Sequence, residues 1–185
     1  MVTGASYSVA AKRRRRRCDR PADGAATRRY PPGVLAFRPV DDTNRAQLEG
    51  LRLAPGQERF VSTVAESLEE AKREPGGRAI PWGVYDDQTP VGFVMISDEV
   101  ECEEYIAHYL WKLLIDERHQ RRGYGTACLD HVAGYFRDRG VDTMWVTAGE
   151  DEGGPIPFYE RYGFVRTGEI VFEDEHLLKL ELTPR

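Results

Sequence analysis

A short run that contains two glycines is the part of the sequence best suited to bind a phosphate group. Gln120-Arg121-Arg122-Gly123-Tyr124-Gly125-Thr126 follows an apolar segment and is followed at once by a helical pattern. Glycine has no Cβ atom, so Gly123 and Gly125 would let a ligand approach the backbone closely. The N–H groups of the first helical turn would point into the same space, where the helix dipole favours an anion. With Arg121 and Arg122 adding positive charge, the run predicts a pyrophosphate cradle; a plain turn before a capped helix is the alternative.

The segments on either side of this run predict a mixed α/β domain with no internal repeat. Apolar residues at three- and four-residue spacing predict helices, and short apolar runs bounded by turns predict strands. The strands are expected over about 34–40, 82–85, 91–96, 109–115, 143–147, 164–170 and 176–182. The helices are expected over about 42–51, 57–74, 124–139 and 157–161. The glycine-containing run therefore connects a strand directly to a helix.

A second motif stands 34 residues after Gly125, where Tyr159 lies within Pro157-Phe158-Tyr159-Glu160-Arg161-Tyr162-Gly163-Phe164. Together the two motifs resemble the GNAT superfamily of N-acetyltransferases. Gln-x-x-Gly-x-Gly is similar to the acetyl-CoA loop of that family, and Phe-Tyr-x-x-x-Gly-Phe is similar to its C-terminal motif. The order of the elements agrees over about residues 34–182. The segments Leu110–Arg118 and Gly163–Glu169 are similar to the spermine/spermidine (diamine) acetyltransferase branch.

The resemblance implies a fold and a donor site. The fold would be a central, mostly antiparallel, twisted sheet of about six to seven strands, splayed at the cofactor strand and flanked by about four helices. The pantetheine arm of acetyl-CoA would lie along the end of that strand like an added strand. The implied cofactor-binding residues are Leu113, Leu114, Ile115, Gln120, Arg121, Arg122, Gly123, Tyr124, Gly125 and Thr126. Glu152 stands where the family often has a cofactor-binding asparagine, and a backbone group of Gly153 or Gly154 is a candidate replacement.

The resemblance also implies that Tyr159 protonates the departing thiolate. A tyrosine pKa of about 10 suits a thiol of similar basicity. The alternative is an aromatic side chain that packs against Phe136 or Phe158. The oxyanion that develops on the thioester needs a donor as well, and the backbone N–H of Leu113 or Leu114 is a candidate.

The attacking amine must be neutral, although a primary amine has a pKa of about 10.4, so a base must take its proton. Acidic and histidine side chains near the cofactor strand are candidates, and each is equally a structural or surface group. These candidates are Asp116, Glu117, His108 and His119.

An acidic stretch points to a cationic acceptor such as a polyamine, a basic peptide end or an aminoglycoside. Its five carboxylates are Asp98, Glu99, Glu101, Glu103 and Glu104. Such a rim would attract a polycation, whereas the alternative is a solvated acidic loop. Trp82 and Trp111 would form an apolar wall for an alkyl-amine chain, unless they are core residues.

The net charge of −5 averages two different parts of the chain. Residues 1–33 carry nine cations and two anions, a net charge of +7, and show no apolar period. They are expected to be a disordered basic tail, with nucleic-acid contact through Lys12–Arg17 as the alternative. Residues 34–185 carry 17 cations and 29 anions, a net charge of −12, and form the expected acetyltransferase domain.

Composition excludes several classes of protein. With 41% hydrophobic and 31% charged residues the chain is typical of a globular protein, and no apolar run is long enough to span a bilayer. Three cysteines without metal-ligand spacing argue against a disulfide framework or a metal site and favour a cytoplasmic protein. We expect a homodimer with contacts around Phe172 and 177–180. A protein or peptide acetyltransferase and a non-catalytic acyl-CoA-binding module remain alternatives.

Overall fold

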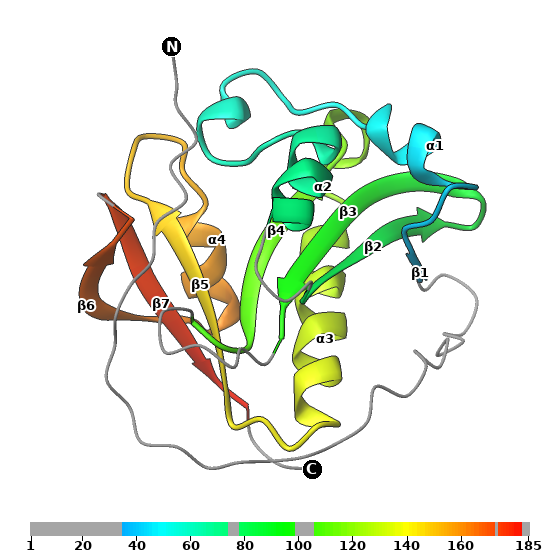
Figure 1. Cartoon of the computed structure of the whole chain (residues 1–185). Helices are drawn as coiled ribbons and strands as arrows, with labels where there is room; N and C mark the ends of the chain where they lie inside the picture. Colours follow the sequence, from blue (N-terminus) through cyan, green and yellow to red (C-terminus); the bar gives the residue numbers. More distant parts are fainter. Residues whose placement is uncertain (1–34, 74–77, 99–105, 173, 183–185) are drawn as a thin grey trace.

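The strands of the chain form one sheet, and helices lie on both of its faces (Figure 1). The computed structural model describes residues 35–73, 78–98, 106–172 and 174–182; the Arg-rich segment 1–33 lies outside them. The strands are β1 (Ala36–Pro39), β2 (Ala79–Asp86), β3 (Thr89–Ser97), β4 (Tyr109–Ile115), β5 (Thr143–Gly149), β6 (Val165–Val171) and β7 (Glu175–Glu181). The α-helices are α1 (Arg45–Glu49), α2 (Val64–Arg73), α3 (Tyr124–Arg137) and α4 (Ile156–Tyr162). In the described part of the chain, these elements confirm the mixed α/β fold, the mostly antiparallel sheet and the four helices expected from the sequence.

The sheet is continuous but weakly joined at its centre. Its strand order is β1-β2-β3-β4-β5-β7-β6, and every neighbouring pair is antiparallel except β4 and β5. These two parallel strands pair only at Tyr109–Trp145 and Leu110–Val146, after which they diverge (Figure 1). Residues 111–115 of β4 therefore pair with β3 alone and present a free edge. This is the splay expected at the cofactor strand.

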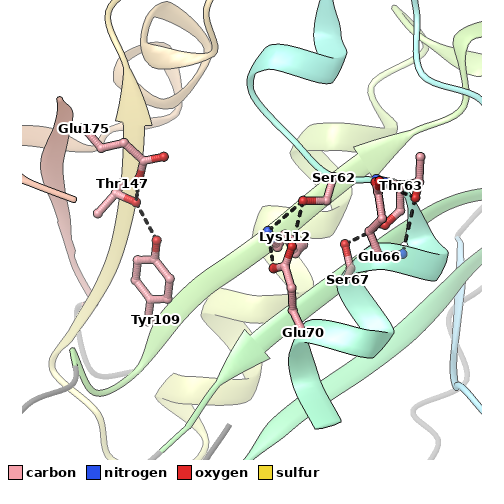
Figure 2. A network of polar contacts seen from close by, with 9 residues as sticks. All are labelled: Ser62, Thr63, Glu66, Ser67, Glu70, Tyr109, Lys112, Thr147 and Glu175. Atoms are coloured by element: carbon pink, nitrogen blue, oxygen red, sulfur yellow. Dashed lines mark hydrogen bonds and ion pairs between the residues drawn. The ribbon is translucent and has the colours of Figure 1, made fainter. Parts of the chain in front are cut away.

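A β-bulge in β4 decides which of its side chains face which layer. The register with β3 shifts at Trp111, the extra residue. Leu110 packs in the core under α3, whereas Trp111 packs with the cluster under α1 and α2. Lys112 lies on that second face too, because its Nζ forms a 2.8 Å ion pair with Glu70 of α2 (Figure 2). Leu113 returns to the α3 layer.

Two apolar clusters hold the helices onto the sheet. The helix predicted over about 124–139 is confirmed as α3, whose buried residues are Cys128, Leu129, Val132, Ala133 and Phe136. On the other face, Leu48 of α1 and Val64 and Leu68 of α2 pack against β3 and β4. In the part of the chain that the structure describes, no helix is long and apolar enough to cross a membrane.

The prediction of one helix over 57–74 is wrong. A 3₁₀ turn, η1 (Gln57–Arg59), is followed by a non-helical stretch, and α2 begins only at Val64. Thr63 and Glu66 set this start as a capping box: the Thr63 N–H donates to the Glu66 carboxylate at 2.9 Å, and the Glu66 N–H donates to Thr63 Oγ1 at 3.3 Å. The Thr-x-x-Glu spacing was the available signal for the break. It leaves Phe60 and Val61 outside any helix.

Most of the side chains that were expected at a dimer contact pack within the chain instead. Leu177 and Leu178 of β7 are buried within the chain, and Leu180 packs against the core. Among the described residues, the large apolar side chains that stay exposed are Val165 and Ile170 of the edge strand β6. The homodimer itself stays a prediction.

Candidate active site

The gap between β4 and β5 opens into a cavity of about 530 Å³. Its walls come from the free half of β4, from β5, from the β4–α3 loop, from α4 and from the segment before α2. The residues singled out in the sequence that line it are Trp111, Leu113, Leu114, Ile115, Gln120, Arg121, Gly123, Tyr124, Gly125, Thr126 and Tyr159, together with His119, Gly153 and Gly154. The fold thus brings the two sequence motifs together around one space.

The free half of β4 turns polar backbone groups toward this gap. The Asp116 N–H donates to the Val91 carbonyl of β3 at 3.0 Å, and backbone groups alternate in direction along a strand. The N–H and C=O groups of Leu113 and Ile115 therefore face away from β3, whereas those of Leu114 face β3. Of the two N–H groups considered as oxyanion donors, the one that faces the gap belongs to Leu113.

The N-terminus of α3 gathers N–H donors at the cavity. The first intrahelical hydrogen bond joins the Ala127 N–H to the Gly123 carbonyl at 3.0 Å, so the N–H groups of residues 124–126 have no partner within the helix. Gly123 is the N-cap residue with φ of 83°, a left-handed conformation that favours glycine. Gly125 is small for another reason, because a Cβ atom there would lie 3.1 Å from the ring of Phe158. Close packing of α3 on α4, rather than ligand approach alone, accounts for this second glycine.

Arginines supply the positive charge at the rim, although not the expected pair. Arg121 and Arg161 line the cavity. Arg121 adopts φ of 60°, an uncommon left-handed conformation for a residue with a Cβ atom. Arg122 does not line the cavity; its guanidinium donates to the Arg118 carbonyl at 3.2 Å. The second cation is therefore Arg161, which the sequence analysis missed although it follows Tyr159 by two positions.

Gln120 acts as a brace between two walls of the cavity. Its Nε2 donates to the Ile115 carbonyl at 3.0 Å and to Gln57 Oε1 at 2.8 Å. Both hydrogens of the amide are therefore used within the protein. Gln120 satisfies one outward-facing carbonyl of β4 and fixes η1 beside the β4–α3 loop.

Tyr159 is buried yet lines the cavity. Its side chain is 7% exposed and packs against Phe158 and Phe164, with ring centroids 5.3 and 5.5 Å apart. Burial, and then the carboxylate of Glu175, raise the pKa of the Tyr159 phenol above its usual value. The phenol is therefore protonated near neutral pH. Among the described residues its hydroxyl has no hydrogen-bond partner, so its proton is available to a group in the cavity.

The two tryptophans are placed differently. Trp111 lines the cavity. The expectation for Trp82 is corrected: it is 4% exposed and packs edge-on against His131 and Tyr135 of α3, each at 5.2 Å between ring centroids. Its position on β2, with the side chain toward α3, removes it from the cavity wall. Glu99, Glu101 and Glu103 lie outside the described residues.

Asp116, a candidate base, is fully engaged in holding the loops that border the cavity. Its carboxylate is buried and accepts hydrogen bonds from the Arg52 N–H at 3.0 Å and from the Arg118 N–H at 2.9 Å. The Arg118 guanidinium adds two bonds of 2.8 Å and holds the pKa of this carboxyl well below its usual range. Asp116 therefore has a structural role, tying the chain after α1 to the turn after β4.

The other candidate bases lie in different surroundings. His108 Nδ1 is 3.1 Å from Asp98, and His108 is not part of the cavity lining. His119 does line the cavity, and its Nδ1 is buried without a hydrogen-bond partner among the described residues. Glu117 is exposed.

The segment before α2 crosses the gap, which the sequence analysis did not foresee. Leu53, Phe60 and Val61 line the cavity. Arg59 donates to the Glu152 carbonyl at 3.3 Å, and the Phe60 ring would lie 3.4 Å from a Cβ atom on Gly154. This segment thus joins the loop after β5 to the β4 side of the sheet. Its role was hidden because Phe60 and Val61 fit a helical spacing.

Known proteins share this fold and this sequence pattern. A family model described as the acetyltransferase (GNAT) family matches residues 57–164. The chain is 28% identical over 155 residues to a spermine/spermidine N(1)-acetyltransferase of Bacillus subtilis (strain 168), covering 80% of this chain and 99% of that protein. An acetyltransferase from Thermus thermophilus is similar in structure, with a TM-score of 0.64 at 21% identity, over 82% of this chain and 99% of that one. A GNAT family acetyltransferase from Elizabethkingia anophelis with acetyl-CoA bound has a TM-score of 0.56 at 14% identity, over 81% and 99% of the two chains.

The role assigned to Asp116 is tested by its replacement with asparagine. We expect Asp116→Asn to lower the free energy of unfolding by about 2 kcal/mol near neutral pH, because the charged hydrogen bonds from Arg118 and Arg52 are weakened. The native pKa of Asp116 is lowered, so its contribution is complete above the unfolded-state pKa of about 3.9 and is lost as the pH falls below it. Urea unfolding should therefore show the difference from wild type shrinking on acidification below about pH 4. Glu117→Gln, at the exposed neighbour, is the control and should change stability by less than about 0.5 kcal/mol.

Proposed function

The chain belongs to the acetyltransferase (GNAT) family and is an N-acetyltransferase, and we propose that it transfers the acetyl group of acetyl-CoA to a primary amine of a polyamine or a similar small cationic molecule. One observation carries the proposal. A single cavity joins the N-terminus of α3, the free edge of β4 and the protonated Tyr159. These are the features needed to bind an anion, to align an amide-containing arm and to protonate a leaving group.

The residues of the cavity fit acetyl-CoA as the donor. The N–H groups at the start of α3, with Arg121 and Arg161, suit the pyrophosphate. The C=O of Leu113 and the N–H of Ile115 suit the two amides of the pantetheine arm, which would extend the sheet on this edge. Bound acetyl-CoA would supply the activated acetyl group, and the N–H of Leu113 would stabilise the oxyanion.

Tyr159 is the proposed acid of the reaction. It gives the proton of its hydroxyl to the sulfur that leaves as the amine nitrogen bonds to the acetyl carbon and the C–S bond breaks. It then recovers a proton from the amide nitrogen formed. Burial keeps the phenol protonated before each turnover, which is the state that an acid requires.

A cationic acceptor is favoured by charge and by the similarity to the Bacillus subtilis polyamine enzyme. Residues 34–185 carry a net charge of −12, which attracts a polycation by long-range electrostatics. Trp111, Phe60 and Val61 line the cavity with apolar surface that suits the methylene chain of such a molecule. The similarity to the polyamine enzyme, the net negative charge and the apolar lining of the cavity thus favour the same substrate class.

The function is tested by thiol release from acetyl-CoA with spermidine, spermine, putrescine, a lysine peptide and an aminoglycoside. We expect turnover with the polyamines at rates well above the peptide. Turnover with the peptide alone would indicate that the acceptor is an amine of a protein rather than a polyamine. Saturable acetyl-CoA binding without thiol release from any amine would contradict the enzymatic proposal.

The donor site is tested by a matched pair of arginines. Arg121→Ala should weaken acetyl-CoA binding by about tenfold, because a charge-assisted contact to phosphate is lost. Arg122→Ala should leave the Kd within about twofold of wild type, since this side chain is bonded to the Arg118 carbonyl away from the cavity. Isothermal titration calorimetry measures both. Equal losses would contradict the assignment of Arg121 to the cradle.

The acid is tested by Tyr159→Phe. We expect kcat to fall by about 10²-fold or more while the Kd for acetyl-CoA stays near that of wild type, because the ring and its packing are retained. The raised pKa of Tyr159 also means that the wild-type rate should show no decline from loss of this proton up to about pH 10. A wild-type rate in the phenylalanine variant would remove Tyr159 from the mechanism.

A further inference from the structure

A chain of three polar side chains crosses the sheet where β4 and β5 begin to diverge. Tyr109 of β4, Thr147 of β5 and Glu175 of β7 lie side by side (Figure 2). The Tyr109 hydroxyl is 2.5 Å from Thr147 Oγ1, and Thr147 Oγ1 is hydrogen-bonded to the Glu175 carboxylate. Tyr109 precedes the free half of β4, so the chain sits at the closed end of the gap.

The direction of these hydrogen bonds follows from the donors available. A carboxylate can only accept, so the single hydroxyl proton of Thr147 is donated to Glu175. Tyr109 must then donate to Thr147. A hydroxyl oxygen has two acceptor positions, and Tyr109 takes one of them. Because Thr147 lines the cavity, its second position is available to an N–H group of a bound molecule.

Thr147 approaches the gap from the face opposite to Tyr159. Its neighbours Val146 and Ala148 pack in the core under α3 and α4, and side chains alternate along a strand. Tyr159 belongs to that α3–α4 layer, whereas Thr147 points to the face covered by α2. Tyr159 and Glu175 are still coupled electrostatically through the sheet, since the charge of Glu175 adds to the effect of burial in raising the pKa of Tyr159.

The charge of Glu175 is not balanced within the described part of the chain. Its neighbour Glu150 pairs with Arg166 at 2.5 Å and with His176 at 2.7 Å. Glu70, on the other side of the gap, pairs with Lys112. Glu175 is partly buried and has Thr147 as its hydrogen-bond partner, but no ion pair among the described residues. A carboxylate in such a position favours a cation nearby.

From these contacts we propose that Thr147 and Glu175 form a proton relay that deprotonates the acceptor amine. The inference rests on the proposed function and names the base that it requires. The ammonium N–H donates to Thr147 Oγ1; as its proton moves to that oxygen, the original Thr147 proton moves to the Glu175 carboxylate. The amine is then neutral and its lone pair is free to attack. Glu175 later returns the proton to solvent, and Tyr109 holds Thr147 in place throughout.

The relay is tested with variants that keep the shape of the site and with two acceptors. With putrescine, Glu175→Gln and Thr147→Val should each lower kcat/KM by about 10²-fold, as expected for loss of a base. Thr147→Ser keeps the hydroxyl and should stay within a few-fold of wild type. With 2,2-difluoroputrescine, whose fluorine atoms leave the adjacent amine largely neutral at about pH 7.5, no base is needed. The Glu175→Gln and wild-type rates should then agree within about threefold.

Further measurements separate the relay from structural effects and from the proposed function. Glu150→Gln, a nearby carboxylate with its own partners, should match wild type with both acceptors, and the Kd for acetyl-CoA should be unchanged in every variant. Equal activity of Glu175→Gln and wild type with putrescine would overturn the relay, as would an equal loss with both acceptors. Absence of wild-type turnover with every amine would instead overturn the proposed function.

Discussion

The rest of the structure depends on the fact that β4 and β5 are joined by only two residue pairs. Beyond these pairs, backbone groups of β4 face a gap instead of a neighbouring strand, and an unsatisfied buried polar group costs about 1–3 kcal/mol. The chain meets part of this demand itself, since Gln120 donates to the Ile115 carbonyl. The groups that remain, on Leu113 and Ile115, need water or a ligand. The same defect that weakens the sheet therefore makes it suited to binding.

A gap of this kind must be held at a fixed width, and contacts outside the sheet do this. Arg59 and Phe60 reach the loop after β5, while Gln57 is bonded to Gln120 next to the end of β4. Asp116 fixes the turn from which the β4–α3 loop starts. At the closed end, Glu175 and Thr147 link β7 to β5, and Tyr109 continues the link to β4 (Figure 2). The two halves of the sheet are thus braced at both ends of the cavity.

The sequence predicted those parts of the fold that depend on local chemistry. The bounds of β4 and the start of α3 were predicted correctly because apolar spacing sets them locally. The junction between β4 and α3 was recognised because its glycines are fixed in a short motif. The 57–74 helix and the cavity-wall role considered for Trp82 were wrong for a different reason, whereas the core alternative for Trp82 is confirmed. Which face a strand residue presents, and where a helix breaks to cross a gap, depend on partners distant in sequence.

The same limit explains why the proposed base was not found. Glu175 begins a strand near the C-terminus, and nothing in its local sequence distinguishes it from neighbouring carboxylates. Its significance comes from its position. Glu175 lies where β4 diverges from β5, and it has no ion-pair partner among the described residues.

In the proposed reaction one charge then has two effects. Burial and then the negative charge of Glu175 raise the pKa of Tyr159, which keeps the acid protonated, and the same charge attracts the ammonium that must lose its proton. Because Tyr159 and Thr147 reach the gap from opposite faces of the sheet, proton donation to sulfur and deprotonation of the ammonium occur on separate sides of the acetyl group. The divergence of β4 and β5 allows side chains from both faces of the sheet to reach the acetyl group.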